Sequence, residues 1–153
     1  MSRDDRLERV IDLLLEDERV ITEGYDLYGL RPVRPEGEYF RANVWSWPAI
    51  LAVVEEVIRE EGLDIDTRGW DENMGAGLQD VEKCRDLAGA LEDFLMKHPD
   101  KKRFVGHSGR IGHTLTVMHV LGGDIGKTNF EVSRDHLEEF VEFLWTCGGF
   151  KIY

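Results

Sequence analysis

Apolar residues recur at intervals of three and four along four stretches of the chain, which is the spacing of an amphipathic α-helix. The stretches are residues 7–15, 46–62, 77–98 and 133–149. Ser46 and Ser133 stand where helix caps are expected. Pro99 ends the third pattern, and Gly148 and Gly149 end the fourth. The hydrophobic pattern therefore predicts about four amphipathic helices.

Two further regions lack a helical period. Residues 22–45 mix glycines and prolines with tyrosines and a phenylalanine. We interpret this segment as a long ordered loop or arm, because so many aromatic rings would be costly to leave in water. Residues 103–121 favour β structure, although residues 113–121 fit a strand or a helix equally well. Residues 150–153 alternate between apolar and polar and predict a short strand.

The expected fold is mainly α, with one or two short β segments, in a single compact α+β-type domain spanning residues 1–153. A chain of 153 residues, 42% of them hydrophobic, fits one core. No apolar run approaches the roughly 18 residues that span a bilayer, and residues 1–5 lack the apolar stretch of a signal peptide. Cys84 and Cys147 have no metal or redox spacing, so we expect a reducing, cytoplasmic location without membrane contact.

Charge is distributed unevenly along the chain. The formal net charge of −12 disfavours direct binding to nucleic acid. Residues 101–130, however, hold five basic side chains and one acid, a net charge of +4 that leaves −16 for the rest. This basic segment predicts either an anion site or internal pairing with acidic helices, and the sequence leaves both open.

Two glycine-containing segments resemble known catalytic motifs but fail on spacing. Residues 122–128 end in Gly-Lys-Thr, yet the first glycine of a phosphate-binding loop would have to occupy position 121, which is Leu121. Residues 106–110 read Gly-His-Ser-Gly-Arg, and Arg110 replaces the last glycine of a nucleophile elbow. Neither segment predicts nucleotide hydrolysis or serine catalysis.

Candidate metal ligands are also poorly placed. His107, His113 and His119 recur every six residues, and glycines break the first interval, so no single element presents all three. Residues 64–69 open like a calcium loop, but Arg68 occupies a position that needs an oxygen ligand. Cys147 is expected to pack in the core rather than act as a nucleophile. The sequence predicts no metal and no cofactor.

Two segments carry residues suited to ligand binding. Residues 37–48 place Arg41 among four aromatic rings at the start of a helix, where it can stack on a ring or bind an anion. Residues 70–78 form a glycine-rich turn, and exposed backbone N–H groups at a helix start bind anions. The alternative for both is an aromatic core with a tight turn.

Three motifs in these segments and at the end of the chain are familiar. They are Tyr-Phe-Arg-x-Asn-Val-Trp-x-Trp at residues 39–47, Asn-x-Gly-x-Gly-Leu at 73–78, and Gly-Gly-Phe-x-Ile at 148–152. Together they resemble a family of small uncharacterised proteins of prokaryotes and their phages. Ser46 and Pro48 stand where the family pattern has another tryptophan and an arginine-proline pair. The resemblance implies no activity.

The leading hypothesis is a non-enzymatic domain that binds a small anionic or nucleotide-like ligand. Its predicted contacts are Arg41, Asn43, Trp45, Trp47, Asn73, His107, Ser108, Arg110, Lys127 and Thr128. The alternative is an acidic interaction module, a decoy or inhibitor of a basic, nucleic-acid-binding protein, which acts through acids between Glu55 and Asp66. A third hypothesis is an enzyme that uses His107 with Asp71 or Asp124. Residues 22–45 are the segment expected to carry any oligomer contact.

Overall fold

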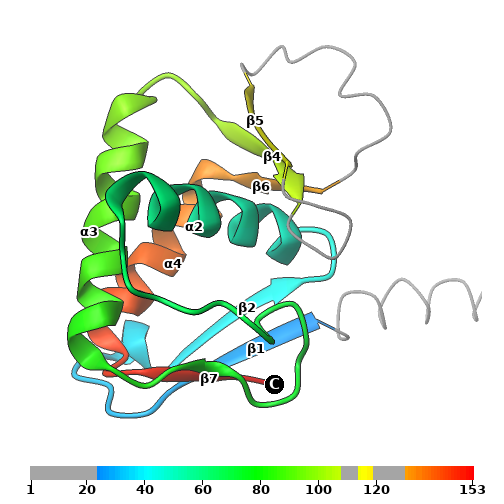
Figure 1. Cartoon of the computed structure of the whole chain (residues 1–153). Coiled ribbons are helices and arrows are strands. Elements are labelled where there is room, and N and C mark those ends of the chain that lie inside the picture. The colour runs from blue at the N-terminus through cyan, green and yellow to red at the C-terminus, as the bar shows by residue number, and fades with distance from the viewer. Residues whose placement is uncertain (1–23, 108–113, 119–129) are drawn as a thin grey trace, which may run out of the picture.

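The computed structural model describes residues 24–107, 114–118 and 130–153, which form three helices and two antiparallel sheets (Figure 1). The helices are α2 (Trp47–Glu61), α3 (Val81–Lys97) and α4 (Arg134–Thr146). The first sheet has the strand order β2-β1-β7-β3 and the second the order β5-β4-β6. The first comprises β1 (Gly24–Gly29), β2 (Tyr39–Asn43), β3 (Gly77–Leu78) and β7 (Phe150–Ile152). The second comprises β4 (Arg103–His107), β5 (Thr114–Met118) and β6 (Glu131–Ser133).

The expectation of a mainly α fold with one or two short β segments is therefore wrong. Residues 22–45 were expected to form a loop or arm, but β1 and β2 pair as an antiparallel hairpin that contributes half of the first sheet. The prolines and Gly37 lie in the connection between the two strands, which contains the 3-10 turn η1 (Pro35–Gly37). Within the strands, alternate side chains such as Leu27 and Phe40 are buried. Residues 103–107 and 114–118 pair as strands, which settles the 113–121 ambiguity for residues 114–118.

The helix predictions are mostly confirmed. Helix α2 begins after Ser46 and ends at Gly62, whose φ of +65° suits a glycine. Helix α4 begins after Ser133, whose side chain accepts a hydrogen bond from the His136 N–H group. The strand expected near residue 150 is β7. The helix expected over residues 7–15 lies outside the described residues.

The predicted start of the third helix at Gly77 is wrong. Helix α3 starts at Val81, and Asp80 caps it by accepting a hydrogen bond from the Lys83 N–H group at 3.1 Å. Gly77 and Leu78 instead form β3, which pairs with β7 at the edge of the first sheet. A side chain at Gly77 would overlap the Phe150 carbonyl, so this pairing requires the glycine.

The core lies between the first sheet and the helices, with α2 running between the two sheets (Figure 1). Trp47 of α2 is fully buried, and its ring meets Phe140 of α4 edge to face, 5.7 Å between centroids. Phe104 of β4 packs against Phe94 of α3, which ties the second sheet to the helices. No helix in the described part of the chain is long and apolar enough to cross a membrane.

Candidate functional site

Arg41, the central residue of the predicted ligand motif, is bound to another side chain. It lies on β2, and its guanidinium makes a 2.6 Å ion pair with the Asp26 carboxylate on β1. The Tyr39 hydroxyl donates a hydrogen bond to the same Asp26 oxygen. Burial lowers the pKa of Arg41, but hydrogen bonding to Asp26 and Tyr39 outweighs it, so the pKa is raised overall. Arg41 is thus a fixed cation on a sheet face.

The other residues of that motif shape the entry into α2. The Asn43 side-chain oxygen accepts hydrogen bonds from the backbone N–H groups of Trp45 at 2.9 Å and Ser46 at 2.8 Å. Ser46 makes no capping bond with its own side chain, so Asn43 orders this turn. Trp47 donates its indole N–H to the Trp70 carbonyl at 2.6 Å inside the core, so its ring cannot stack on a ligand. Trp45 stays half-exposed against Phe130.

The glycine-rich turn at residues 70–78 is not the predicted helix-start anion site. Its N–H groups do not open α3, because β3 and Asp80 intervene. The Gly75 N–H group donates to the Ile152 carbonyl at 2.6 Å, and Asn73 donates its amide to the Gly24 carbonyl at 3.3 Å. The turn therefore fastens the end of the first sheet.

Most of the predicted basic site lies outside the described residues, so it stays a prediction. Ser108, Arg110, Lys127 and Thr128 lie outside the described residues, as do the Gly-Lys-Thr segment and two of the three evenly spaced histidines. His107 ends β4 in the second sheet, whereas Arg41 lies in the first. Asp71, the acid suggested for catalysis with His107, lies beside the first sheet, where its carbonyl accepts the Tyr25 hydroxyl. Among the described side chains no group of three or more His, Cys, Asp or Glu residues could hold a metal ion.

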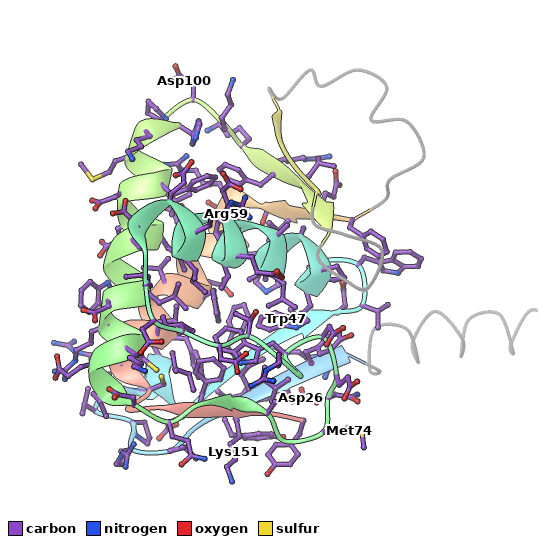
Figure 2. All side chains as sticks on the ribbon, in the orientation of Figure 1. Asp26, Trp47, Arg59, Met74, Asp100 and Lys151 are labelled. Carbon is purple, nitrogen blue, oxygen red and sulfur yellow. The ribbon has the colours of Figure 1, made fainter. Side chains whose placement is uncertain are left out.

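Two surfaces stand out instead, and the first is the open face of the first sheet. Alternation along β2, β1 and β7 turns Phe40, Leu27 and Ile152 toward the helices. The opposite face carries Tyr39, Arg41, Asp26, Tyr28, Lys151 and Tyr153. Figure 2 shows Lys151 on the side of the sheet that faces away from the helices. We call this set the tyrosine face.

The second surface is a groove of about 550 Å³ along the outer side of α3, next to α4. It is lined by Glu61, Leu63, Arg85, Asp86, Gly89, Ala90, Glu92, Asp93, Met96 and Trp145. A smaller hollow of about 190 Å³ shares Glu92 and Met96 with it and extends over α4. We refer to the two together as the α3–α4 groove. Its lining combines acidic side chains, which we call the rim, with the apolar side chains of Leu63, Ala90, Met96 and Trp145, which we call the floor.

The floor of the groove is held in place by contacts between the two helices. Trp145 donates its indole N–H to the Glu92 carboxylate at 2.7 Å, which fixes the ring across α3 and α4. Gly89 faces this ring, and a Cβ built on it would meet only one Trp145 ring atom, at 4.0 Å. Space for a small side chain at residue 89 therefore remains open beside the Trp145 ring.

The acidic residues of the alternative hypothesis are mostly engaged elsewhere. Glu56 pairs with Arg59, and Asp66 pairs with Arg68. Hydrogen bonds from Arg68 hold the pKa of the Asp66 carboxyl below its usual value. Of the acids between residues 55 and 66, only Glu61 lines the groove. The sequence signal for the groove was the pair Gly89 and Met96 on the polar face of α3, which the helical pattern alone does not distinguish from ordinary surface.

The two cysteines, far apart in sequence, meet in the core. Cys84 and Cys147 are both fully buried, which confirms the packing role expected for Cys147. The Cys84 thiol donates to the Leu78 carbonyl at 3.6 Å. Hydrogen bonding to Cys147, followed by burial, raises the pKa of Cys84, so this thiol stays uncharged at neutral pH. The pair joins α3 to the end of α4.

The described residues thus define a two-sheet domain with helices packed on one side of each sheet and with two exposed surfaces of distinct chemistry. No family model, no curated protein and no solved structure matches the chain.

Proposed function

We propose that this protein is a binding domain whose α3–α4 groove takes a cationic, amphipathic segment of a protein partner. The observation that supports this function best is the combination of an acidic rim and an apolar floor in one hollow. An amphipathic helix docks by placing its apolar side chains in such a groove. The charges around the hollow then select the sign of its polar face.

The charge of the rim is strongly one-sided. The larger part of the groove is lined by four acids, Glu61, Asp86, Glu92 and Asp93, against one base, Arg85. The smaller part adds the acids Glu138 and Glu142 and the base Arg134. Lysines or arginines of a partner therefore meet an excess of carboxylates, whereas an anionic ligand is repelled.

Arg134 contributes one positive charge to the lining, but its guanidinium is directed at backbone carbonyls and makes no close ion pair with the acids of the smaller hollow. It donates hydrogen bonds to the carbonyls of Leu95 at 3.0 Å, His98 at 2.7 Å and Lys101 at 3.2 Å, at the C-terminal end of α3. Its distance to the Glu138 carboxylate is 3.9 Å. The acids of the smaller hollow thus remain available to a cationic partner.

The floor supplies the apolar contact. Met96 is 75% exposed and Trp145 is 37% exposed, and both line the groove beside Gly89 and Ala90. Methionine and tryptophan at an exposed hollow are typical of interaction surfaces, since a thioether adapts to varied partners and an indole offers a large rigid contact. An apolar side chain of the partner is expected to enter beside Gly89, over the Trp145 ring.

The test uses a fluorescein-labelled synthetic helix with a leucine stripe and a lysine face, titrated with the protein and followed by anisotropy. We expect saturable binding that weakens as salt is raised. A peptide of the same composition with the stripe scrambled should bind much more weakly. Equal affinity for the two peptides would show that charge alone attracts them and would overturn the proposal.

Matched charge changes locate the binding. The double variant Asp86→Asn/Asp93→Asn removes two rim acids and should weaken binding by about fivefold, since each exposed charge contributes about 0.2–1 kcal/mol. The control Asp100→Asn/Glu139→Gln removes two exposed acids that do not line the groove. It should leave the affinity within about twofold, since exposed charges that do not contact the peptide are screened by salt. An equal loss in both variants would place the peptide elsewhere.

A further inference from the structure

The tyrosine face has a regular two-row pattern set by strand pairing. Tyr28 of β1 stands opposite Tyr39 of β2 and opposite Lys151 of β7. In the neighbouring row Asp26 stands opposite Arg41, and Asp26 and Tyr153 exchange two backbone hydrogen bonds of 2.7 Å. Side chains in such rows project from one face of a sheet.

The three tyrosine rings form one continuous exposed cluster. Tyr28 lies between the other two, with ring centroids 5.4 Å from Tyr39 and 6.1 Å from Tyr153. Their exposed fractions are 47%, 46% and 49% for Tyr28, Tyr39 and Tyr153, so each keeps about half of its surface in water. The described helices pack on the opposite face of the sheet, as Figure 1 shows. Contiguous exposed rings of this kind mark a binding surface more often than scattered single ones do.

The charge of this face differs from that of the molecule. Arg41 and the Tyr39 hydroxyl both bind the Asp26 carboxylate, which neutralises it in place. Lys151 adds a further ammonium group beside Tyr28. The tyrosine face therefore carries a formal charge of about +1, on a protein whose net charge is −12.

We propose that the tyrosine face binds a planar ring that carries a negative charge, the chemistry of a nucleobase with its phosphate. The base stacks on Tyr28 and its neighbours, and the phosphate lies near Lys151. Exposed aromatic rings on a sheet beside a cation bind bases in this way, because every base offers a flat face for stacking. This is the ligand class of the leading sequence hypothesis, here assigned to Tyr28 and Lys151, which that hypothesis did not include.

A free nucleotide and a single-stranded oligonucleotide present the same chemistry. The acidic remainder of the protein repels a long phosphate backbone, which favours the small ligand. The proposal is independent of the α3–α4 groove, since no residue of the tyrosine face lines the groove.

The experiment titrates 2-aminopurine riboside monophosphate with the full chain, because its fluorescence is quenched when the base stacks. We expect saturable quenching by the natural protein. The affinity should fall about tenfold in Tyr28→Ala and stay unchanged in Tyr28→Phe, which keeps the ring. The control Val33→Ala removes part of an exposed apolar side chain that does not belong to the tyrosine face. Absence of quenching, or an equal loss in Tyr28→Ala and Val33→Ala, overturns the proposal.

A second variant tests the proposal even if Tyr28→Ala does not fold. Lys151→Gln should lower the affinity for the monophosphate but leave the affinity for the unphosphorylated riboside unchanged, since only the monophosphate carries the charge that Lys151 contacts. Equal effects on both ligands would contradict the assigned phosphate position. Tighter, salt-dependent binding of a 2-aminopurine-labelled hexanucleotide would identify a strand as the source of the base, and equal binding would identify the nucleotide.

Discussion

Gly89 offers the sharpest test of the α3–α4 groove, because its effects on folding and on binding have opposite signs. A glycine in a helix interior costs about 0.5–1 kcal/mol relative to alanine. Gly89 lies in the middle of α3, and a Cβ built there meets only a Trp145 ring atom at 4.0 Å, an ordinary contact. Packing therefore gives no reason for glycine at this position, and a larger side chain here would occupy part of the groove.

Gly89→Ala should accordingly raise the free energy of unfolding by about 1 kcal/mol, which corresponds to about 2–4 °C in the melting temperature of a domain of this size. Gly89→Leu should be at least as stable as the natural protein, since leucine is also a strong helix former. Its side chain fills the space beside Trp145, so the affinity for the amphipathic peptide should fall by about tenfold or more, as one apolar anchor is excluded.

Thermal unfolding followed by circular dichroism and peptide anisotropy are measured on the same samples. Glu139→Leu places a leucine on α4 outside the groove, and Glu139→Gln corrects for the lost charge. A Gly89→Leu protein that is stable and binds the peptide normally would show that the groove is not the site. A Gly89→Ala protein that is less stable than the natural one would show that the space beside Trp145 is not open.

Three further outcomes check the packing on which both surfaces rest. Arg134→Met should lower the free energy of unfolding by about 3 kcal/mol in urea titrations, because three hydrogen bonds from a charged donor are lost. The control Arg103→Met breaks an exposed ion pair with Glu131 and should lower the free energy of unfolding by less than about 1 kcal/mol. Burial and the charge of Asp71 raise the pKa of the Tyr25 hydroxyl above 10.0, so the folded state favours the neutral tyrosine. The free energy of folding gained from the neutral hydroxyl is present below pH 10 and is lost as the pH rises through the raised pKa. Above pH 10, the free energy of unfolding should therefore fall more steeply in the natural protein than in Tyr25→Phe. Cys84 and Cys147 should react with a bulky thiol reagent only in denaturant, and rapid labelling of the native protein would contradict their burial.

The helix ends were predictable because local signals set them. Ser133 caps α4 through its own side chain, and Gly62 ends α2 in a left-handed conformation, as their residue types indicate. The start of α3 was misplaced because Gly77 and Leu78 resemble a helix entry locally. Their backbone groups pair with β7, more than 70 residues away, and no local pattern contains that pairing.

Contacts between residues far apart in sequence also explain why the candidate sites were only partly predicted. Arg41 and the aromatic residues near it were identifiable as unusual, but only the strand register shows that Tyr28 and Lys151 lie beside it on one face. Trp47 looked equally suited to a ligand, yet its indole N–H bonds the Trp70 carbonyl in the core. A hollow beside Gly89 needs both α3 and the Trp145 ring of α4, so it depends on tertiary packing.

The tyrosine face and the α3–α4 groove should act independently, although one turn connects them. Helix α4 leads through Gly148 and Gly149 into β7, and Arg31 fixes this turn by donating to the Gly148 carbonyl at 2.9 Å and the Gln79 carbonyl at 2.6 Å. A clamped turn offers no second arrangement through which occupancy of one surface can bias the other. Tyr28→Ala should then leave peptide affinity unchanged within about twofold, and Gly89→Leu should leave the base quenching unchanged, as for separate sites. If each ligand instead changed the affinity of the other by the same factor, the sites would be coupled and the independence inferred from the clamped turn would be wrong.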